Sequence, residues 1–79
     1  MAKYEQDVQA LLRLIGGKEN IRAVSHCMTR MRFVLADEKK ADTDGIGKLP
    51  SVKGTFTQAG QYQVIIGNDV STFYNEFTA

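Results

Sequence analysis

The sequence lacks several features that would place it in well-defined classes of protein. It contains one cysteine and therefore no internal disulfide, which suits a reducing compartment. Its net charge of +1 gives no whole-chain preference for nucleic acid or for an anionic membrane. The longest apolar runs are too short to span a membrane, and the opening MAKYEQDV lacks the apolar core of a signal peptide. One cysteine and one histidine cannot supply a zinc ligand set.

The length and composition favour one small globular domain spanning residues 1–79. A chain of this size buries roughly 60–65% of its unfolded surface, which is enough for a single modest core. Hydrophobic residues make up 43% of the sequence and charged residues 24%, and no internal repeat or linker interrupts it. Because the chain begins with methionine and stops abruptly after STFYNEFTA, we expect it to be the N-terminal part of a longer protein.

Two segments near the ends of the chain carry the periodicity of amphipathic helices. The first covers about residues 4–15 and ends at a pair of glycines, which adopt the left-handed conformation without steric cost. The second follows a cap at Asn68 or Asp69. The apolar stripes of these two helices consist of Val8, Leu11, Leu12, Ile15, Val70, Phe73, Tyr74 and Phe77.

Two strands are expected directly after the first helix. NIRAVSHC and TRMRFVLA both resemble extended segments, and only a residue or two around Met28 separates them. This spacing predicts an antiparallel hairpin with Cys27 at its tip. In the second strand, alternation places the apolar side chains on one face and Arg30 and Arg32 on the other.

The second half of the chain supplies another helix and another hairpin. A charged, solvated loop, DEKKADTD, leads into a short helix over about residues 43–49, which is capped by Asp42 or Thr43 and contains two glycines. SVKGTFT and QYQVIIG predict strands on either side of the turn QAG. The order α-β-β-α-β-β-α predicts an α+β fold, in which three helices cover one face of an antiparallel four-stranded sheet.

Cys27 allows two interpretations. A lone cysteine in a strand is often a buried filler of the core, whereas one at a hairpin tip is exposed. Here Arg30 and Arg32 follow on one strand face, about 6.6–7 Å apart, which lets two guanidiniums bind one tetrahedral anion. Their positive charge would lower the pKa of the thiol, and the Thr29 hydroxyl and nearby backbone amides would add donors. A solvated strand face remains the alternative for the two arginines.

The residues around Cys27 exclude other kinds of cysteine chemistry. His26 is its neighbour in a strand, so its side chain points to the opposite face. We interpret it as a structural residue, or as one that supports the site through its neighbours, rather than as a catalytic base. Arg30 stands where a redox Cys-x-x-Cys motif needs its second cysteine, and Phe33 stands where a phosphatase loop needs its arginine. No acid lies within residues 20–36, so the hairpin has no local base to activate water.

The hairpin sequence SHCMTRMRF resembles the phosphorylation signature of the IIB domains of the bacterial sugar phosphotransferase system, glucose–sucrose type. That signature is usually Cys-x-Thr-Arg-Leu-Arg. Cys27, Thr29, Arg30 and Arg32 match it, and Met31 takes the place of the leucine. The segment IGGKENI, ahead of the first strand, is also typical of the family.

A second motif extends the resemblance over nearly the whole chain. VKGTFTQAGQYQVIIG resembles the downstream strand pair of the family, and Gln63 takes the position of a glutamine that approaches the active site. The glucose branch often has an acid two residues before the cysteine, where this chain has Ser25. The sequence is therefore most similar to trehalose-specific IIB domains, with sucrose-specific domains next.

The resemblance implies a cysteine phosphoryl carrier. Cys27 would accept a phosphoryl group from a phosphohistidine of a IIA protein or domain. It would then pass the group to a sugar, a disaccharide such as trehalose, bound in the membrane-embedded IIC domain. No metal or cofactor is implied, and the domain would lie in the cytoplasm at the inner face of the membrane, linked to IIC but not itself inserted. The implied phosphate-binding residues are Met28, Thr29, Arg30, Arg32 and Gln63.

A non-enzymatic interaction module or an RNA-binding module on the same sheet is the alternative. Such a module would present stacking aromatic side chains on its free sheet face. Phe33 and Tyr62, however, fall in register with apolar neighbours that are expected to face the core. The near-neutral net charge also disfavours nucleic acid as a partner.

Overall fold

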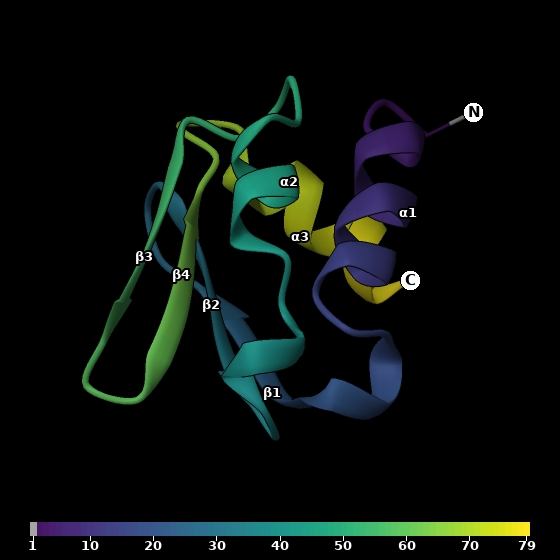
Figure 1. Ribbon diagram of the computed structural model, residues 1–79. Helices are drawn as coiled ribbons and strands as arrows, with labels where there is room; N and C mark the ends of the chain where they lie inside the picture. The colour runs from purple at the N-terminus through teal and green to yellow at the C-terminus, as the bar shows by residue number, and fades with distance from the viewer. Residues whose placement is uncertain (1) are drawn as a thin grey trace.

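The helices and the strands form two separate layers in the computed structural model, which describes residues 2–79 (Figure 1). In chain order the elements are α1 (Glu5–Leu14), β1 (Ile21–His26), β2 (Arg30–Leu35), α2 (Thr43–Gly47), β3 (Gly54–Gln58), β4 (Gln61–Ile65) and α3 (Val70–Thr78). Two 3-10 helices, Lys18–Asn20 and Glu38–Lys40, precede β1 and α2. The predicted α+β fold and element order are confirmed. Within residues 2–79, no helix is long and apolar enough to cross a bilayer.

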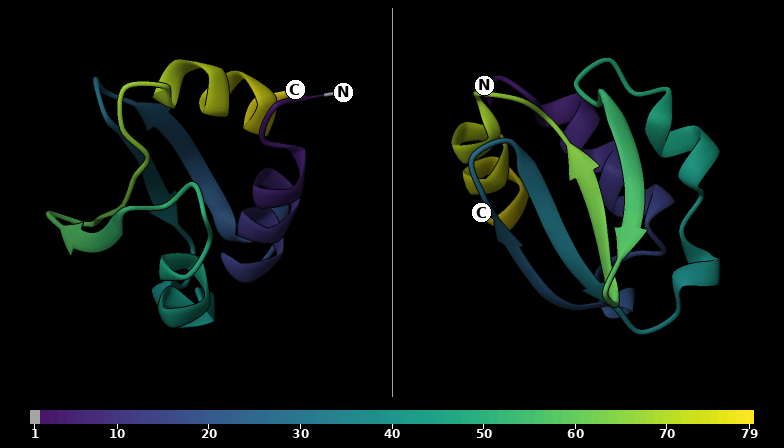
Figure 2. Two further views of the ribbon diagram at one scale, coloured as in Figure 1. Left: turned by 90° about the horizontal axis from the view of Figure 1, so that it is seen from above. Right: turned by 90° about the vertical axis from the view of Figure 1, so that its left-hand side faces the viewer.

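The two hairpins join through β2 and β4, which gives the strand order β1-β2-β4-β3. All neighbouring strands are antiparallel. The helices cover one face of this sheet, and the other face is left open, as the right-hand view of Figure 2 shows. β2 therefore lies in the interior of the sheet, and its outward side chains have neighbours from β1 and from β4.

Strand alternation decides which side chains form the core. Phe33 on β2 and Tyr62 on β4 are buried on the helix side, as predicted, and the ring of Phe33 meets that of Phe77 edge-on at 5.5 Å. Burying one such side chain stabilises the fold by about 1.5–3 kcal/mol. The buried apolar residues are Val8, Leu11, Ile15, Met31, Phe33, Leu35, Ile46, Val52, Tyr62, Val64, Ile66, Val70 and Phe73.

Asn20 connects three segments at the base of the first hairpin. The sequence predicted it as a strand residue, but it lies in a 3-10 helix and is only 2% exposed. Its Nδ2 donates to the carbonyl oxygens of Ile15 (2.8 Å) and Asp37 (2.9 Å), and its Oδ1 accepts from the Asp37 amide (2.8 Å). A buried amide with all these partners holds the end of α1 against the end of β2.

Two other predicted boundaries differ for local reasons. β3 begins at Gly54, three residues later than predicted. The segment before it is held elsewhere, because the Ser51 amide donates to the carboxylate of Asp7 on α1 at 2.9 Å and not to a strand. Asp69 occupies the N-cap position of α3, but its side chain makes no cap hydrogen bond. It accepts instead from Lys3 Nζ at 2.9 Å and from the hydroxyl of Tyr4.

The predicted cap of α2 is confirmed, although the helix is shorter than expected. The Asp42 carboxylate accepts from the Gly45 amide at 3.0 Å, and the helix ends at Gly47. A cap of this kind satisfies one of the free amides at the start of the helix.

A two-residue turn joins β3 to β4. The sequence predicted the turn as QAG, but Gln58 pairs with Gln61, so only Ala59 and Gly60 lie outside the ladder. Both have positive φ, 54° at Ala59 and 78° at Gly60, which is the pattern of a type I′ turn. Alanine is disfavoured in this conformation because its Cβ crowds the backbone.

We expect Ala59→Asn to stabilise the protein, because asparagine tolerates the left-handed conformation that the turn requires. The free energy of unfolding, measured by urea denaturation, should rise by about 0.5–1 kcal/mol. Ala36→Asn is the matched control, since Ala36 is also exposed but has negative φ. An equal gain in both variants would contradict the explanation.

Candidate functional site

Residues 27–29 form the loop at the tip of the first hairpin. The predicted hairpin with Cys27 at its tip is confirmed, although three residues separate the strands rather than one or two. The Cys27 amide donates to the carbonyl of Arg30 at 3.0 Å. The carbonyl of Thr29 accepts from the amides of Ile66 and Gly67, each at 2.9 Å. The loop is therefore fixed both to its own hairpin and to the connection between β4 and α3.

The Cys27 thiol is partly buried and surrounded by donors. Hydrogen bonds from the Thr29 amide, the Arg32 guanidinium and the Arg30 amide lower the pKa of the thiol from 9.0 to about 7, against an opposing effect of burial. A thiol with this pKa is substantially ionised at neutral pH, and the thiolate is the nucleophilic form. The loop thus combines an activated sulfur with donors that fit an anion.

Arg30 and Arg32 share the open face of the sheet, as strand alternation predicted, but their contacts differ. The Arg32 guanidinium lowers the pKa of the thiol, and its Nη1 donates to Oε1 of Gln61 at 3.1 Å. Arg30 donates from Nη1 to Oε1 of Gln63 at 3.1 Å, and its Cζ lies 4.6 Å from the ring centroid of Phe56. In this state Arg32 therefore acts on the sulfur, while Arg30 packs against the sheet.

Register brings Gln63 into this group. It pairs with Arg32 on one side and with Phe56 on the other, and it is only 4% exposed. The sequence predicted Gln63 as a site residue but did not identify Gln61 or Phe56. Gln61 precedes Gln63 by two positions and hence shares its face, a signal that was available. Phe56 depends on the register of β3, which the turn at Ala59 and Gly60 sets.

His26 and Met28 flank the cysteine in different ways. Met28 is the most exposed large apolar side chain recorded, at 87%. His26 pairs with Met31, whose side chain is in the core, so the imidazole lies on the helix side of the sheet as predicted. Its ring centroid is 4.6 Å from that of Tyr74, and its Nδ1 is 2.9 Å from the Cys27 carbonyl oxygen.

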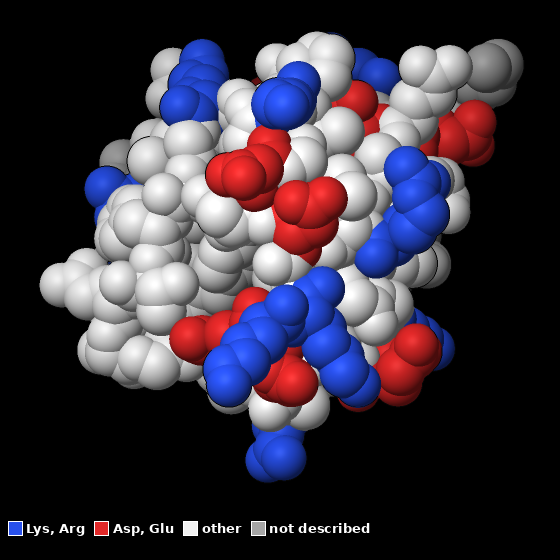
Figure 3. Space-filling model, viewed as in Figure 1, with Lys and Arg blue, Asp and Glu red and all other residues white. Residues whose placement is uncertain are grey.

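Arg30 and Arg32 bring positive charge to the sheet beside the loop, whereas the face shown in Figure 3 is mixed. Lysine, arginine and acidic side chains are interspersed over the face shown in Figure 3, and neither sign covers it. Within residues 2–79, no group of three or more histidine, cysteine or acidic side chains is arranged to hold a metal ion.

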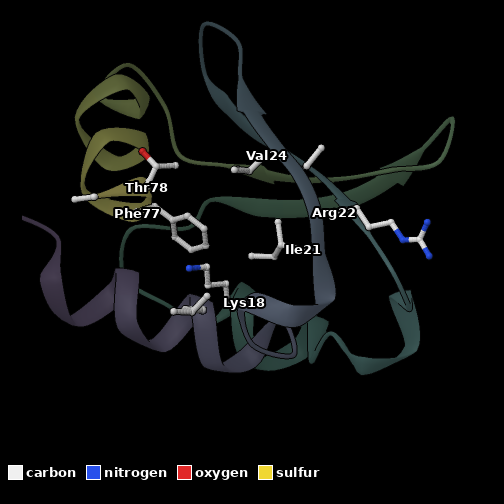
Figure 4. A pocket seen from close by; sticks show the side chains of 9 residues that line it. Lys18, Ile21, Arg22, Val24, Phe77 and Thr78 are labelled. Carbon is white, nitrogen blue, oxygen red and sulfur yellow. The ribbon is translucent and has the colours of Figure 1, made fainter.

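Two hollows of about 380 Å³ each lie away from the cysteine loop. One lies beside the edge strand β1, where Ile21, Val24 and Phe77 form its apolar wall and Lys18 extends across it (Figure 4). The other lies near the start of α1, between Lys3 and Ser51. Neither hollow contains a residue of the cysteine loop.

Comparison with known proteins agrees with this geometry. Residues 9–42, which include the whole cysteine hairpin, match the family model described as phosphotransferase system, EIIB. The chain is 49% identical over its full length to the trehalose-specific EIIBC component of Escherichia coli K12, and 52% identical over 85% of its length to the sucrose-specific EIIBC component of Klebsiella pneumoniae. It spans only 17% and 15% of these two relatives.

A solved structure is similar over almost the whole fold. It is the crystal structure of one domain of the PTS system IIabc component from Clostridium difficile, with a TM-score of 0.89 and 35% sequence identity. The match covers 96% of this chain and 80% of that one. The chain therefore belongs to the EIIB family of the phosphotransferase system, the phosphotransferase family that its cysteine motif predicted.

Proposed function

We propose that this domain carries a phosphoryl group on Cys27, from a phosphohistidine of a IIA partner to a sugar held by a IIC domain. The observation that carries the proposal is the setting of Cys27 at the hairpin tip, where the Thr29 amide, Arg32 and the Arg30 amide lower the pKa of the thiol to about 7. The same donors that stabilise a thiolate suit the oxygens of a phosphoryl group on that sulfur. The absence of acidic residues between positions 20 and 36 leaves the hairpin with no carboxylate to activate water against the intermediate.

The proposed transfer has two displacement steps. In the first, the Cys27 thiolate attacks the phosphorus of phosphohistidine, the N–P bond breaks, an S–P bond forms, and the imidazole leaves and takes up a proton. In the second, a sugar hydroxyl attacks the phosphorus, the S–P bond breaks, an O–P bond forms, and the hydroxyl proton passes to a base on the acceptor side. Both steps depend on in-line placement and on charge stabilisation, since phosphoryl transfer has a largely loose transition state.

The residues of the loop have separate roles in this scheme. Arg32 and the amides of Thr29 and Arg30 already lower the pKa of the thiol and would hold the transferred oxygens. The Thr29 hydroxyl and the Met28 amide would add neutral donors. Arg30 would join when the phosphoryl group arrives, and Gln63, which now accepts a hydrogen bond from Arg30, would position it.

The proposed partners follow from the relatives that contain this domain. We propose that the domain is the N-terminal part of a membrane permease. The EIIBC relatives are several times longer than this chain, which supports a longer protein with a linked IIC domain. The domain would then lie on the cytoplasmic side of the membrane. We propose a disaccharide as the sugar, and trehalose in particular, because the trehalose-specific relative matches the full length of the chain.

The RNA-binding alternative receives less support from the sheet. Phe56 lies on the open face, where it would be available for stacking, but the Arg30 guanidinium lies over its ring. Phe33 and Tyr62 are in the core, and the net charge is +1. A stacking platform would need exposed aromatic rings and a basic surface.

The pH dependence of Cys27 reactivity tests its activation. The rate of alkylation by iodoacetamide should be half-maximal near pH 7 and should fall as pH falls, because protonation removes the thiolate. Arg32→Gln should move the midpoint upward, toward 9.0, whereas Arg30→Gln should leave it nearly unchanged, because only the Arg32 side chain bonds the sulfur. Equal shifts in the two variants would contradict the different roles of the arginines.

Phosphorylation of Cys27 tests the carrier function directly. Incubation with phosphorylated IIA should add one phosphoryl group, detected by intact mass, and Cys27→Ser should abolish this labelling because serine supplies no thiolate. Met28→Leu keeps an apolar side chain at the exposed tip and serves as a control that should remain labelled. Undiminished labelling of Cys27→Ser would refute the mechanism.

A domain exchange tests the proposed sugar. This chain, placed in a trehalose-specific EIIBC protein in place of its own IIB domain, should restore phosphorylation-dependent trehalose uptake. The same exchange into a sucrose-specific EIIBC protein should restore sucrose uptake at a rate roughly tenfold lower. This difference corresponds to ~1.4 kcal/mol of weaker binding between this domain and the IIC domain. Exchange chimaeras with Cys27→Ser are the controls, and better function with sucrose would reverse the assignment.

A further inference from the structure

The cysteine loop has two backbone carbonyls whose directions are fixed by hydrogen bonds from outside it. The carbonyl of Thr29 accepts from the amides of Ile66 and Gly67. The carbonyl of Cys27 lies 2.9 Å from Nδ1 of His26. The first contact belongs to the backbone frame of the fold, whereas the second comes from a side chain to which the proposed mechanism gives no role.

A fixed carbonyl also fixes the amide of the same peptide group. The peptide unit is planar, and the described residues 2–79 contain no cis peptide bond, so the C=O and N–H of each unit point in opposite directions. The relation also holds at Thr29, whose carbonyl accepts from the amides of Ile66 and Gly67 while the Arg30 amide of the same peptide group lowers the pKa of the Cys27 thiol. By the same relation, holding the Cys27 carbonyl toward His26 directs the Met28 amide away from the imidazole. That is the side of the sheet on which Arg30 and Arg32 lie.

The hydrogen bond also determines the state of the imidazole. A carbonyl oxygen can only accept, so Nδ1 of His26 must carry the hydrogen, in the neutral ring or in the imidazolium. The ring is braced on its other side by Tyr74, with 4.6 Å between centroids and an interplanar angle of 48°. His26 is therefore held between α3 and the loop, in one tautomer when it is neutral.

We propose that His26 is a positioning residue for phosphoryl transfer, which rests on the function proposed above for Cys27. Its Nδ1–H orients the Cys27–Met28 peptide, so that the Met28 amide joins those of Thr29 and Arg30 around the incoming phosphoryl oxygens. His26 exchanges no proton with the reacting atoms and acts only through the direction of this peptide group.

Two variants of His26 separate positioning from packing. Asparagine can place an amide N–H near the position of Nδ1, while phenylalanine keeps an aromatic ring against Tyr74 but has no donor. In phosphorylation by IIA, His26→Phe should be about tenfold slower than the unaltered chain, the loss expected from one hydrogen bond that matters at the transition state. His26→Asn should stay within about threefold, and the thermal midpoint of His26→Phe should change little. Nitrogen NMR of the unaltered protein at alkaline pH should show the hydrogen of His26 on Nδ1.

Each outcome decides the proposal. A slow phenylalanine variant rescued by asparagine, together with the Nδ1–H tautomer, supports it. The proposal is overturned if both variants react at unchanged rates, if both lose the same amount of rate, or if the hydrogen lies on Nε2. The carrier function of Cys27 is still supported in these cases, as long as the unaltered chain is labelled and Cys27→Ser is not. Failure of the unaltered chain to accept a phosphoryl group overturns both proposals.

Discussion

The contact on which the site depends is the pair of hydrogen bonds that the Thr29 carbonyl accepts from Ile66 and Gly67. These bonds attach the tip of the first hairpin to the end of the second hairpin, at the connection to α3. Because the peptide group is planar, they also direct the Arg30 amide toward the Cys27 sulfur. Gly67 reaches this position with a φ of 109°, a conformation that glycine adopts readily. A contact between segments almost forty positions apart thus sets the direction of a donor to the reactive sulfur.

The sequence predicted the parts of this arrangement that follow from local pattern. Alternation in TRMRFVLA placed Arg30 and Arg32 on the open face, and the same rule placed Phe33 and Tyr62 in the core. The local sequence pattern could not predict which residues the arginines contact, because these contacts depend on pairing between β2, β4 and β3. The register of β3 follows from a two-residue turn containing an alanine at positive φ, which sequence preferences do not favour. The sequence therefore did not predict that Phe56 lies beside the site. It also did not predict the burial of the Asn20 side-chain amide, whose hydrogen-bond partners come from two other segments.

In the function proposed above, the sulfur of Cys27 would react with two large partners in turn, and an exposed hairpin tip suits this role. A small-molecule enzyme usually encloses its substrate in a concave pocket, whereas the two measured hollows of this domain lie elsewhere. The loop protrudes between the sheet and the start of α3, with the exposed side chain of Met28 at its tip. The sheet below it supplies rigidity, since β2 is paired on both sides and its inner face is packed against the helices. In the proposed function, the domain would present the same rigid loop to a donor protein and to an acceptor domain.

The partners of Arg30 are suited to its release. A carboxylate would neutralise the guanidinium and hold it with a charge-assisted hydrogen bond, roughly twice as strong as a neutral one. Gln63 and Phe56 hold it instead with a neutral acceptor and an aromatic face, so the positive charge is still available. A phosphoryl group on Cys27 would bring a charge approaching −2 and three strong acceptors to the same face. In the proposed function, the balance of these interactions would favour movement of Arg30 from the sheet to the phosphoryl oxygens, while Arg32, which already lowers the pKa of the thiol, would serve both states.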